Sequence, residues 1–138
     1  MKEPVVPDSS CLIALERIHA VHLLPALFEP IAVPPEVARE FGTSLSWLRV
    51  QVPENRALVA ALQLLVDDGE AEAIALAAER SWRIILDDRR ARLIANRVGL
   101  RLIGTLGVLV RAKRAGVISL VRPLLDRLDQ RNFAVASR

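Results

Sequence analysis

The chain has no tyrosine, a single cysteine and only two lysines among its 138 residues. One cysteine, Cys11, cannot form an internal disulfide or a zinc cluster, and its apolar surroundings indicate a buried thiol. The few aromatic residues are too scattered along the sequence for a platform that stacks nucleotide bases. We expect two of them, Trp47 and Trp82, in the core or at an interface. These absences argue against disulfide scaffolds, cysteine-based zinc sites and base-stacking surfaces.

Long apolar runs and an N-terminal signal region are also missing. No uncharged stretch approaches the roughly 18 residues that a membrane span needs. The start, MKEPVVPD, has no apolar signal segment followed by a small-residue cleavage site. The motifs GxSxG and P-loop do not occur, and GTLG at 104–107 is too short to be a dinucleotide fingerprint. We therefore expect a cytoplasmic protein with no membrane segment and no protein nucleophile.

What the chain has instead is an aliphatic composition and an uneven charge. Hydrophobic residues make up 52% of it and aromatic residues 4%, which predicts a core of Ala, Leu, Val and Ile. Residues 1–79 contain 5 Lys and Arg against 12 Asp and Glu, whereas residues 80–138 contain 14 against 4. An acidic site beside a basic surface, as where metal ions meet a polyanion, explains this asymmetry. A solvated charged surface explains it equally well.

Apolar runs alternate with turn residues along the chain. We expect strands at 5–6, 31–33, 83–86 and 100–103, while 43–53 is either an edge strand or a loop. Ser9 or Ser10 is expected to cap a first helix, and further helices are expected at 21–28, 35–41, 54–66, 69–80, 89–98, 105–115 and 119–128. The alternation predicts an α/β fold, a three-layer α/β/α sandwich with a short parallel sheet of four or five strands. One domain over 1–138 is expected, with its core at about 5–128 and a polar tail at 129–138.

Two aspartates follow strands of the predicted sheet. Asp8 follows the first strand and Asp88 follows the strand that ends at Leu86, and ligands of parallel sheets gather at the carboxyl ends of the strands. Asp87 is a second candidate, because side-chain alternation turns it away from Asp88. Carboxylates that share one edge repel one another by on the order of several kcal/mol at an effective dielectric of ~20. The sequence therefore predicts a cation between them.

Two glutamates are candidates for the same place. Glu40 lies late in its helix, where the helix dipole disfavours a carboxylate, so that a function would explain its presence. Glu70 either closes a capping box with Asp67, or contributes to the site, or does both. Because it shares a helix face with Ile74, Glu70 is expected to point inward and Glu72 outward.

The donor set predicts the kind of metal. Carboxylate oxygens without His or Cys suit Mg²⁺ or Mn²⁺ and argue against zinc. His19 and His22 are expected on the surface, for want of a third ligand nearby. Arginines follow Asp88 at positions 89, 90, 92 and 97, and they could hold phosphates beside the cation. Arg89 and Arg92 are the first candidates for substrate binding, although ion pairs or dimer contacts would account for most of these arginines.

Four stretches, in this order, resemble PIN-domain nucleases, in particular VapC-like toxins of type II toxin–antitoxin systems. They are VVPDSSCLIAL, VPPEVAREF, DDGEAEAIALA and IILDDRRAR, and the resemblance spans residues 5 to about 125. The stretches GEAEAIALA, LDD-x-x-AR and IGTLGVL are also similar to a prokaryotic PIN branch of unassigned function. The resemblance implies a three-layer domain, often a dimer, whose acidic residues hold one or two Mg²⁺ or Mn²⁺ ions and hydrolyse RNA.

Carried over to this chain, the resemblance implies specific roles. Four residues would be catalytic: Asp8, Glu40, Glu70 and Asp88. Asp8 and Asp88 would be the metal ligands, and Ser10 would occupy the small polar position beside the substrate. The chain departs from the common toxin pattern at Glu70, where Asp is usual, and at Leu86, where a hydroxyl residue is usual.

Three functions remain open at this point. The first is a Mg²⁺- or Mn²⁺-dependent endoribonuclease that acts as a toxin, with RNA as substrate, a cognate antitoxin protein as partner and a homodimer as its assembly. The second is a catalytically weak or inactive PIN-like module that binds RNA or regulates. The third is a receiver-like signalling domain phosphorylated on Asp, which lacks the lysine expected late in the sheet because Lys2 and Lys113 are the only lysines.

Overall fold

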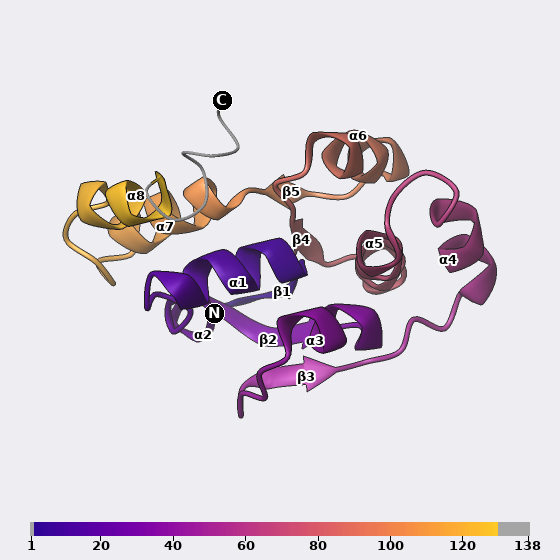
Figure 1. Cartoon of the computed structure of the whole chain (residues 1–138), viewed down its shortest axis with the longest axis horizontal. Coiled ribbons are helices and arrows are strands. Elements are labelled where there is room, and N and C mark those ends of the chain that lie inside the picture. The colour runs from indigo at the N-terminus through magenta and orange to yellow at the C-terminus, as the bar shows by residue number, and fades with distance from the viewer. Residues whose placement is uncertain (1, 130–138) are drawn as a thin grey trace.

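Five strands form the sheet at the centre of the molecule (Figure 1). The structure, a computed structural model, describes residues 2–129, so that 130–138 of the predicted polar tail lie outside the described residues. The strands are β1 (Glu3–Pro7), β2 (Phe28–Val33), β3 (Leu48–Val50), β4 (Arg83–Ile85) and β5 (Leu102–Ile103). All neighbours pair in parallel, in the order β3-β2-β1-β4-β5. The predicted parallel sheet is confirmed, and the ambiguous segment 43–53 contains the edge strand β3.

Eight helices surround the sheet within the described part of the chain. They are α1 (Ser9–Arg17), α2 (Leu23–Leu27), α3 (Pro35–Phe41), α4 (Arg56–Leu62), α5 (Asp68–Arg80), α6 (Arg89–Val98), α7 (Thr105–Arg114) and α8 (Arg122–Leu128). The chain moves outward from β1 to β3 through α1, α2 and α3, then returns to β4 through α4 and α5 and reaches β5 through α6. Because parallel crossovers are right-handed, the reversal places the two sets of helices on opposite faces. The predicted three-layer sandwich is thereby confirmed.

The core is aliphatic, as the composition predicts. Buried side chains of β1 and β4 pack against α5, whose buried alanines bring the helix backbone close to the sheet. Cys11 is buried, and Trp47 and Trp82 are half-buried against the core. None of the helices in residues 2–129 is long and apolar enough to cross a membrane.

The strand order reverses between β1 and β4. The backbone N–H of Asp8 donates to the carbonyl of Ile85 at 3.0 Å, which extends the pairing of these two strands to their carboxyl ends. In open α/β sheets, the crevice at such a reversal is where ligands bind. The fold therefore directs attention to the residues that follow β1 and β4.

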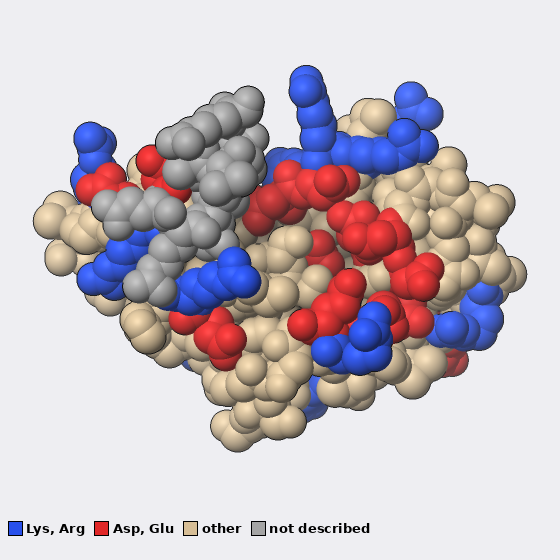
Figure 2. All heavy atoms as spheres, in the orientation of Figure 1, with Lys and Arg blue, Asp and Glu red and all other residues tan. Residues whose placement is uncertain are grey.

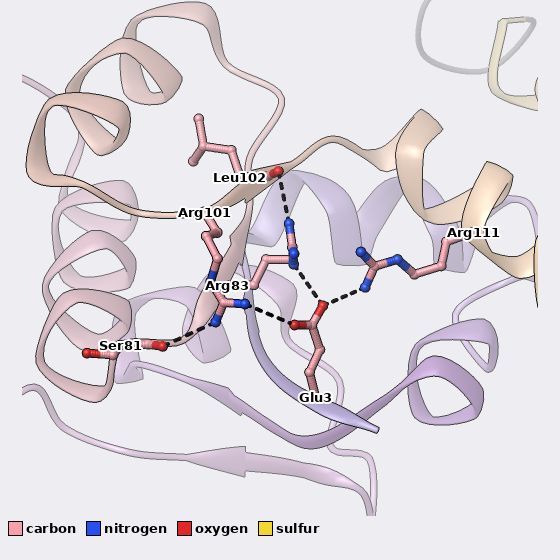
Figure 3. A network of polar contacts seen from close by, with 6 residues as sticks. All are labelled: Glu3, Ser81, Arg83, Arg101, Leu102 and Arg111. Atoms are coloured by element: carbon pink, nitrogen blue, oxygen red, sulfur yellow. Dashed lines mark hydrogen bonds and ion pairs between the residues drawn. The ribbon is translucent and has the colours of Figure 1, made fainter. Parts of the chain in front are cut away.

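The opposite, amino edge of the sheet is held by a network of ion pairs around Glu3 (Figure 3). Arg83 Nε and Arg111 Nη1 donate to Glu3 Oε1 at 2.8 and 2.5 Å. Arg101 Nη1 donates to the other oxygen, Oε2, at 3.4 Å. Burial raises the pKa of Glu3, but the hydrogen bonds and charges of Arg111 and Arg83 outweigh it and lower the pKa below its ordinary value. The network ties β1, β4, β5 and α7 together.

Candidate functional site

Asp8 is the most deeply buried carboxylate at the carboxyl edge of the sheet. Its residue surface is only 3% exposed. Burial raises the pKa of Asp8 to about 7, a backbone hydrogen bond from Ser9 lowers it in part, and the charges of Asp67, Glu40 and Asp87 raise it further. The carboxyl group thus lies in a dry position that faces other acids.

The two serines after Asp8 have different surroundings. The prediction that one of them caps α1 is wrong, because Asp8 occupies the N-cap position. Ser9 is buried and donates its hydroxyl to Glu40 Oε1 at 3.0 Å. Ser10, the predicted substrate-binding residue, is exposed on α1, and its role stays a prediction. Sequence reasoning missed Ser9 because its contact joins residues 31 positions apart.

Glu40 reaches from the last turn of α3 to the first turn of α5. A methyl group added to Gly69 would lie 2.4 Å from Glu40 Oε1, so that the glycine makes room for the carboxylate. The positive end of the α5 dipole and the Ser9 hydroxyl both favour a negative charge there. These contacts offset the unfavourable position of Glu40 in its own helix.

Glu70 closes a capping box at the start of α5, one of the roles that the sequence left open. Its backbone N–H donates to Asp67 Oδ1 at 2.8 Å, and the Asp67 N–H donates to Glu70 Oε1 at 3.3 Å. Burial raises the pKa of Glu70 to about 7, and the charges of Asp67, Asp8 and Asp88 raise it while the backbone hydrogen bond of Asp67 lowers it. Glu70 therefore points inward, caps its helix and faces the other acids.

The prediction that Glu72 points outward is wrong. Its carboxylate is half-buried and accepts a hydrogen bond from the backbone N–H of Glu36 at 3.1 Å. It also pairs with Arg56 at 3.7 Å. Glu72 thus connects α5 to the first turn of α3, a contact that the helical pattern of α5 alone does not reveal.

Asp87 and Asp88 are neighbours in sequence whose side chains diverge, as alternation predicts. Asp88 is exposed and caps α6, its Oδ2 accepting from the N–H of Ala91 at 2.9 Å. Asp87 is half-buried, its Oδ1 accepting from the N–H of Thr105 at 2.8 Å while its other oxygen binds the Thr105 hydroxyl. The charge of Asp87 raises the pKa of Asp8, and the charge of Asp88 raises the pKa of Glu70. Both aspartates therefore adjoin the buried acids.

Arginines of α6 border these acids. Arg89 is exposed at the start of the helix. Arg90 donates to the carbonyl of Leu65 and Arg92 to the carbonyl of Leu86, each at 2.7 Å. Figure 2 shows acidic side chains gathered in the middle of one face, with basic side chains above them where α6 lies. An anion that approaches the acids would meet these positive charges.

Six carboxylates make up what we call the acidic edge: Asp8, Glu40, Asp67, Glu70, Asp87 and Asp88. Oxygen donors of this kind are the ligands that Mg²⁺ and Mn²⁺ prefer. In residues 2–129, no three Asp, Glu, His or Cys side chains converge tightly enough to hold a metal ion as they stand. Oxygens of Glu40, Asp87 and Asp88 accept hydrogen bonds from Ser9, Thr105 and Ala91. The donor chemistry of the acidic edge fits a divalent cation.

A family model described as a PIN domain matches residues 4–138 of the chain. No curated protein matches it. The matched range contains the whole acidic edge and all five strands apart from Glu3, the first residue of β1.

Proposed function

We propose that this chain, which belongs to the PIN-domain family, is a Mg²⁺- or Mn²⁺-dependent endoribonuclease. PIN domains share a nuclease fold, generally use divalent metal ions and act on RNA. The observation that carries the proposal is the acidic edge, where Asp8 is buried among other carboxylates at the reversal point of the sheet. Stability alone does not explain why the charges that act on buried Asp8 within residues 2–129 are those of other acids.

Asp8 and Asp88 would hold the cation from the ends of β1 and β4, and Glu40 and Glu70 would complete the pocket. A bound divalent cation supplies a water activated for attack on phosphorus and stabilises negative charge on the phosphate oxygens. The raised pKa values of Asp8 and Glu70 mean that these carboxyl groups exchange protons near neutral pH, so that cation binding displaces protons from them.

Neighbouring residues position these groups. The Ser9 hydroxyl fixes one oxygen of Glu40, and the Asp67 N–H fixes one oxygen of Glu70. Arg89, exposed beside Asp88, is placed to meet a phosphate, whereas Arg92 is half-buried and braces the carbonyl of Leu86. Leu86 is fully buried and contributes no polar group, which favours a weak or inactive RNA-binding module as the second candidate.

Cleavage of labelled total RNA tests the proposal. Purified protein should cleave with Mg²⁺ or Mn²⁺ and stop when a chelator is added. Asp8→Asn should lower the rate at least about 100-fold, because several kcal/mol of transition-state stabilisation depends on the metal. Asp126→Asn, the same change at an exposed position of α8, is the matched control and should keep the wild-type rate.

Metal binding to the folded chain gives a second measurement. At 100 times its Kd, Mg²⁺ should add about 2.7 kcal/mol to the free energy of unfolding and raise the Tm of the wild type but not of Asp8→Asn.

RNA binding without cleavage would favour the RNA-binding module over the ribonuclease. Loss of growth on expression, relieved by Asp8→Asn, would support the toxin role, and the mass in solution would test the homodimer. Capture of a small antitoxin encoded beside the gene would identify the partner.

A further inference from the structure

A groove of about 660 Å³ lies beside β5, α6 and α7. Its apolar lining residues are Ile103, Leu106 and Val110. Among the residues that the structure describes, three guanidinium groups also line it, those of Arg92, Arg111 and Arg114, together with one carboxylate, that of Asp87. The groove therefore combines apolar side chains with an excess of positive charge.

One end of the groove opens at the acidic edge. Asp87 lies at this end, where it binds Thr105 at the start of α7, and its charge also acts on Asp8. Arg111 and Arg114 stand in the last turns of α7, whose 10 residues span about 15 Å at 1.5 Å per residue. A chain that leaves the acidic edge can follow the groove along α7.

Within residues 2–129, the positive charge at the far end of the groove is only partly neutralised. Arg111 pairs with Glu3, but Glu3 also binds Arg83 and Arg101, so that three guanidinium groups share one carboxylate (Figure 3). Arg114 is exposed nearby, in the last turn of the same helix. The arginines of α7 thus place positive charge at the end of the groove that lies away from the acidic edge.

Two glycines shape the wall of the groove. A methyl group at Gly104 would lie 3.0 Å from both Arg92 Nη1 and Asp87 Oδ1. At Gly107 it would lie 2.7 Å from Cγ1 of Ile103. The motif GTLG, which is no dinucleotide fingerprint, thus serves the close packing of α7 against β5 beneath the groove.

We infer that this groove binds the phosphodiester backbone of single-stranded RNA that extends from the acidic edge, an inference that rests on the proposed ribonuclease function. Guanidinium groups bind phosphates through paired N–H donors, and apolar side chains accommodate ribose. The length of about 15 Å corresponds to roughly four nucleotides at the stacked spacing of ~3.4 Å per nucleotide, and to fewer for an extended strand. Since aromatic side chains do not line the groove in the described structure, binding is independent of base sequence.

A pair of neighbouring variants tests the groove. Arg114→Gln and Lys113→Gln each remove one positive charge from the last turn of α7 and lose the same interaction with the helix dipole. Both side chains are exposed, but only Arg114 lines the groove. Binding of a fluorescein-labelled RNA of eight nucleotides is measured by anisotropy in chelator, so that cleavage plays no part.

We expect Arg114→Gln to weaken RNA binding about 5- to 10-fold and to reduce the salt slope by about 0.7. Lys113→Gln should stay within twofold of the wild type, and Arg114→Lys should restore the slope because it restores the charge. With metal present, Arg114→Gln should raise KM for the long RNA and leave kcat unchanged, because the contact is equal in ground and transition states.

If Arg114→Gln and Lys113→Gln weaken RNA binding equally, or if neither weakens it, the groove does not bind RNA. The proposal of metal-dependent cleavage would be unaffected by that result. If polyglutamate at equal concentration displaces the RNA, the groove binds acidic peptides, and the inference that it binds RNA is wrong. If the chain cleaves no RNA but Arg114→Gln alone weakens binding, the groove stands and the ribonuclease proposal fails.

Discussion

The two edges of the sheet hold their carboxylates in opposite electrostatic states. At the amino edge, Glu3 is surrounded by arginines, and its pKa lies below the ordinary value despite burial. At the carboxyl edge, Asp8 faces other acids, and its pKa is raised to about 7. Within residues 2–129, three arginines pair with Glu3, whereas the charges that act on Asp8 are those of other acids.

Burial makes the contrast sharper. The Glu3 side chain is 27% exposed, yet it has three basic partners, whereas Asp8 is only 3% exposed and faces acids. The free-energy cost of a charge rises as the charge is buried. If stability alone decided, the arginines would therefore lie beside Asp8. The comparison supports the proposal that the amino edge serves stability and the carboxyl edge binds a cation.

The largest expected effect comes from Asp8→Asn in metal-free protein. The ordinary pKa of an Asp is 3.8, and the pKa of Asp8 in the folded chain is about 7. At pH 8 Asp8 is ionised, and its charge lowers the free energy of unfolding. Removing that charge should stabilise the protein by about 2 to 4 kcal/mol at pH 8, although it abolishes the proposed cleavage. Urea denaturation in chelator measures the gain.

The dependence on pH follows from the same shift. Between pH 7 and 4 the folded state binds a proton that the unfolded state does not, so the wild type gains stability as the pH falls. The advantage of Asp8→Asn should therefore shrink by more than half at pH 5. A constant difference across this range would contradict the raised pKa.

Glu3→Gln should have a smaller effect of opposite sign. It leaves Arg83, Arg101 and Arg111 without their shared partner and should destabilise the fold by about 1 to 2 kcal/mol, the partial exposure of the network limiting the loss. Because the pKa of Glu3 is lowered, this contribution is present at neutral pH and is lost as the pH falls through the folded value. Urea denaturation at pH 7 and pH 3 measures both effects.

Glu16→Gln, an exposed change on α1, serves as the control for Glu3→Gln. At saturating RNA, the rate of cleavage should be the same in both variants, since Glu3 lies at the edge away from the proposed site and its partner Arg111 acts only on RNA binding. A loss of cleavage in Glu3→Gln at full stability would remove the distinction between the two edges.

The sequence predicts the positions of the site residues better than their contacts. Asp8 and Asp88 follow strands, and a parallel sheet brings strand ends together, so local pattern and one topological rule suffice. The capping box of Asp67 and Glu70 is equally local, since its residues are three positions apart. The ordered motifs identify the family, which the PIN-domain match confirms.

Contacts between distant segments escape that reasoning. Ser9 binds Glu40 and Glu72 binds the backbone of Glu36, and neither contact has a periodic signal in the sequence. The uneven charge of the two halves maps only in part onto surfaces. Asp87, from the basic half, belongs to the acidic edge, and the arginines that neutralise Glu3 come from the other half of the chain.

The smallest expected effect on stability, from Gly69→Ala, tests whether stability and function are separate at the carboxyl edge. Replacing a helical glycine by alanine ordinarily stabilises by about 0.5 to 1 kcal/mol. Here the new methyl group would lie 2.4 Å from Glu40 Oε1, and the flexible carboxylate must move away from Ser9. We expect unfolding free energy within about 0.5 kcal/mol of the wild type, but metal-dependent cleavage reduced about 3- to 10-fold.

Ser9→Ala removes the same hydrogen bond from its other partner, which permits a double-mutant cycle. We expect both changes to act by releasing the Glu40 carboxylate. In that case the double variant should cleave as fast as the slower of the two single variants, because the hydrogen bond can be lost only once. Multiplying losses would mean that Gly69 acts on the site by another route. Wild-type cleavage in both single variants would show that Glu40 needs no fixed position, and the acidic edge would then act through its charge alone.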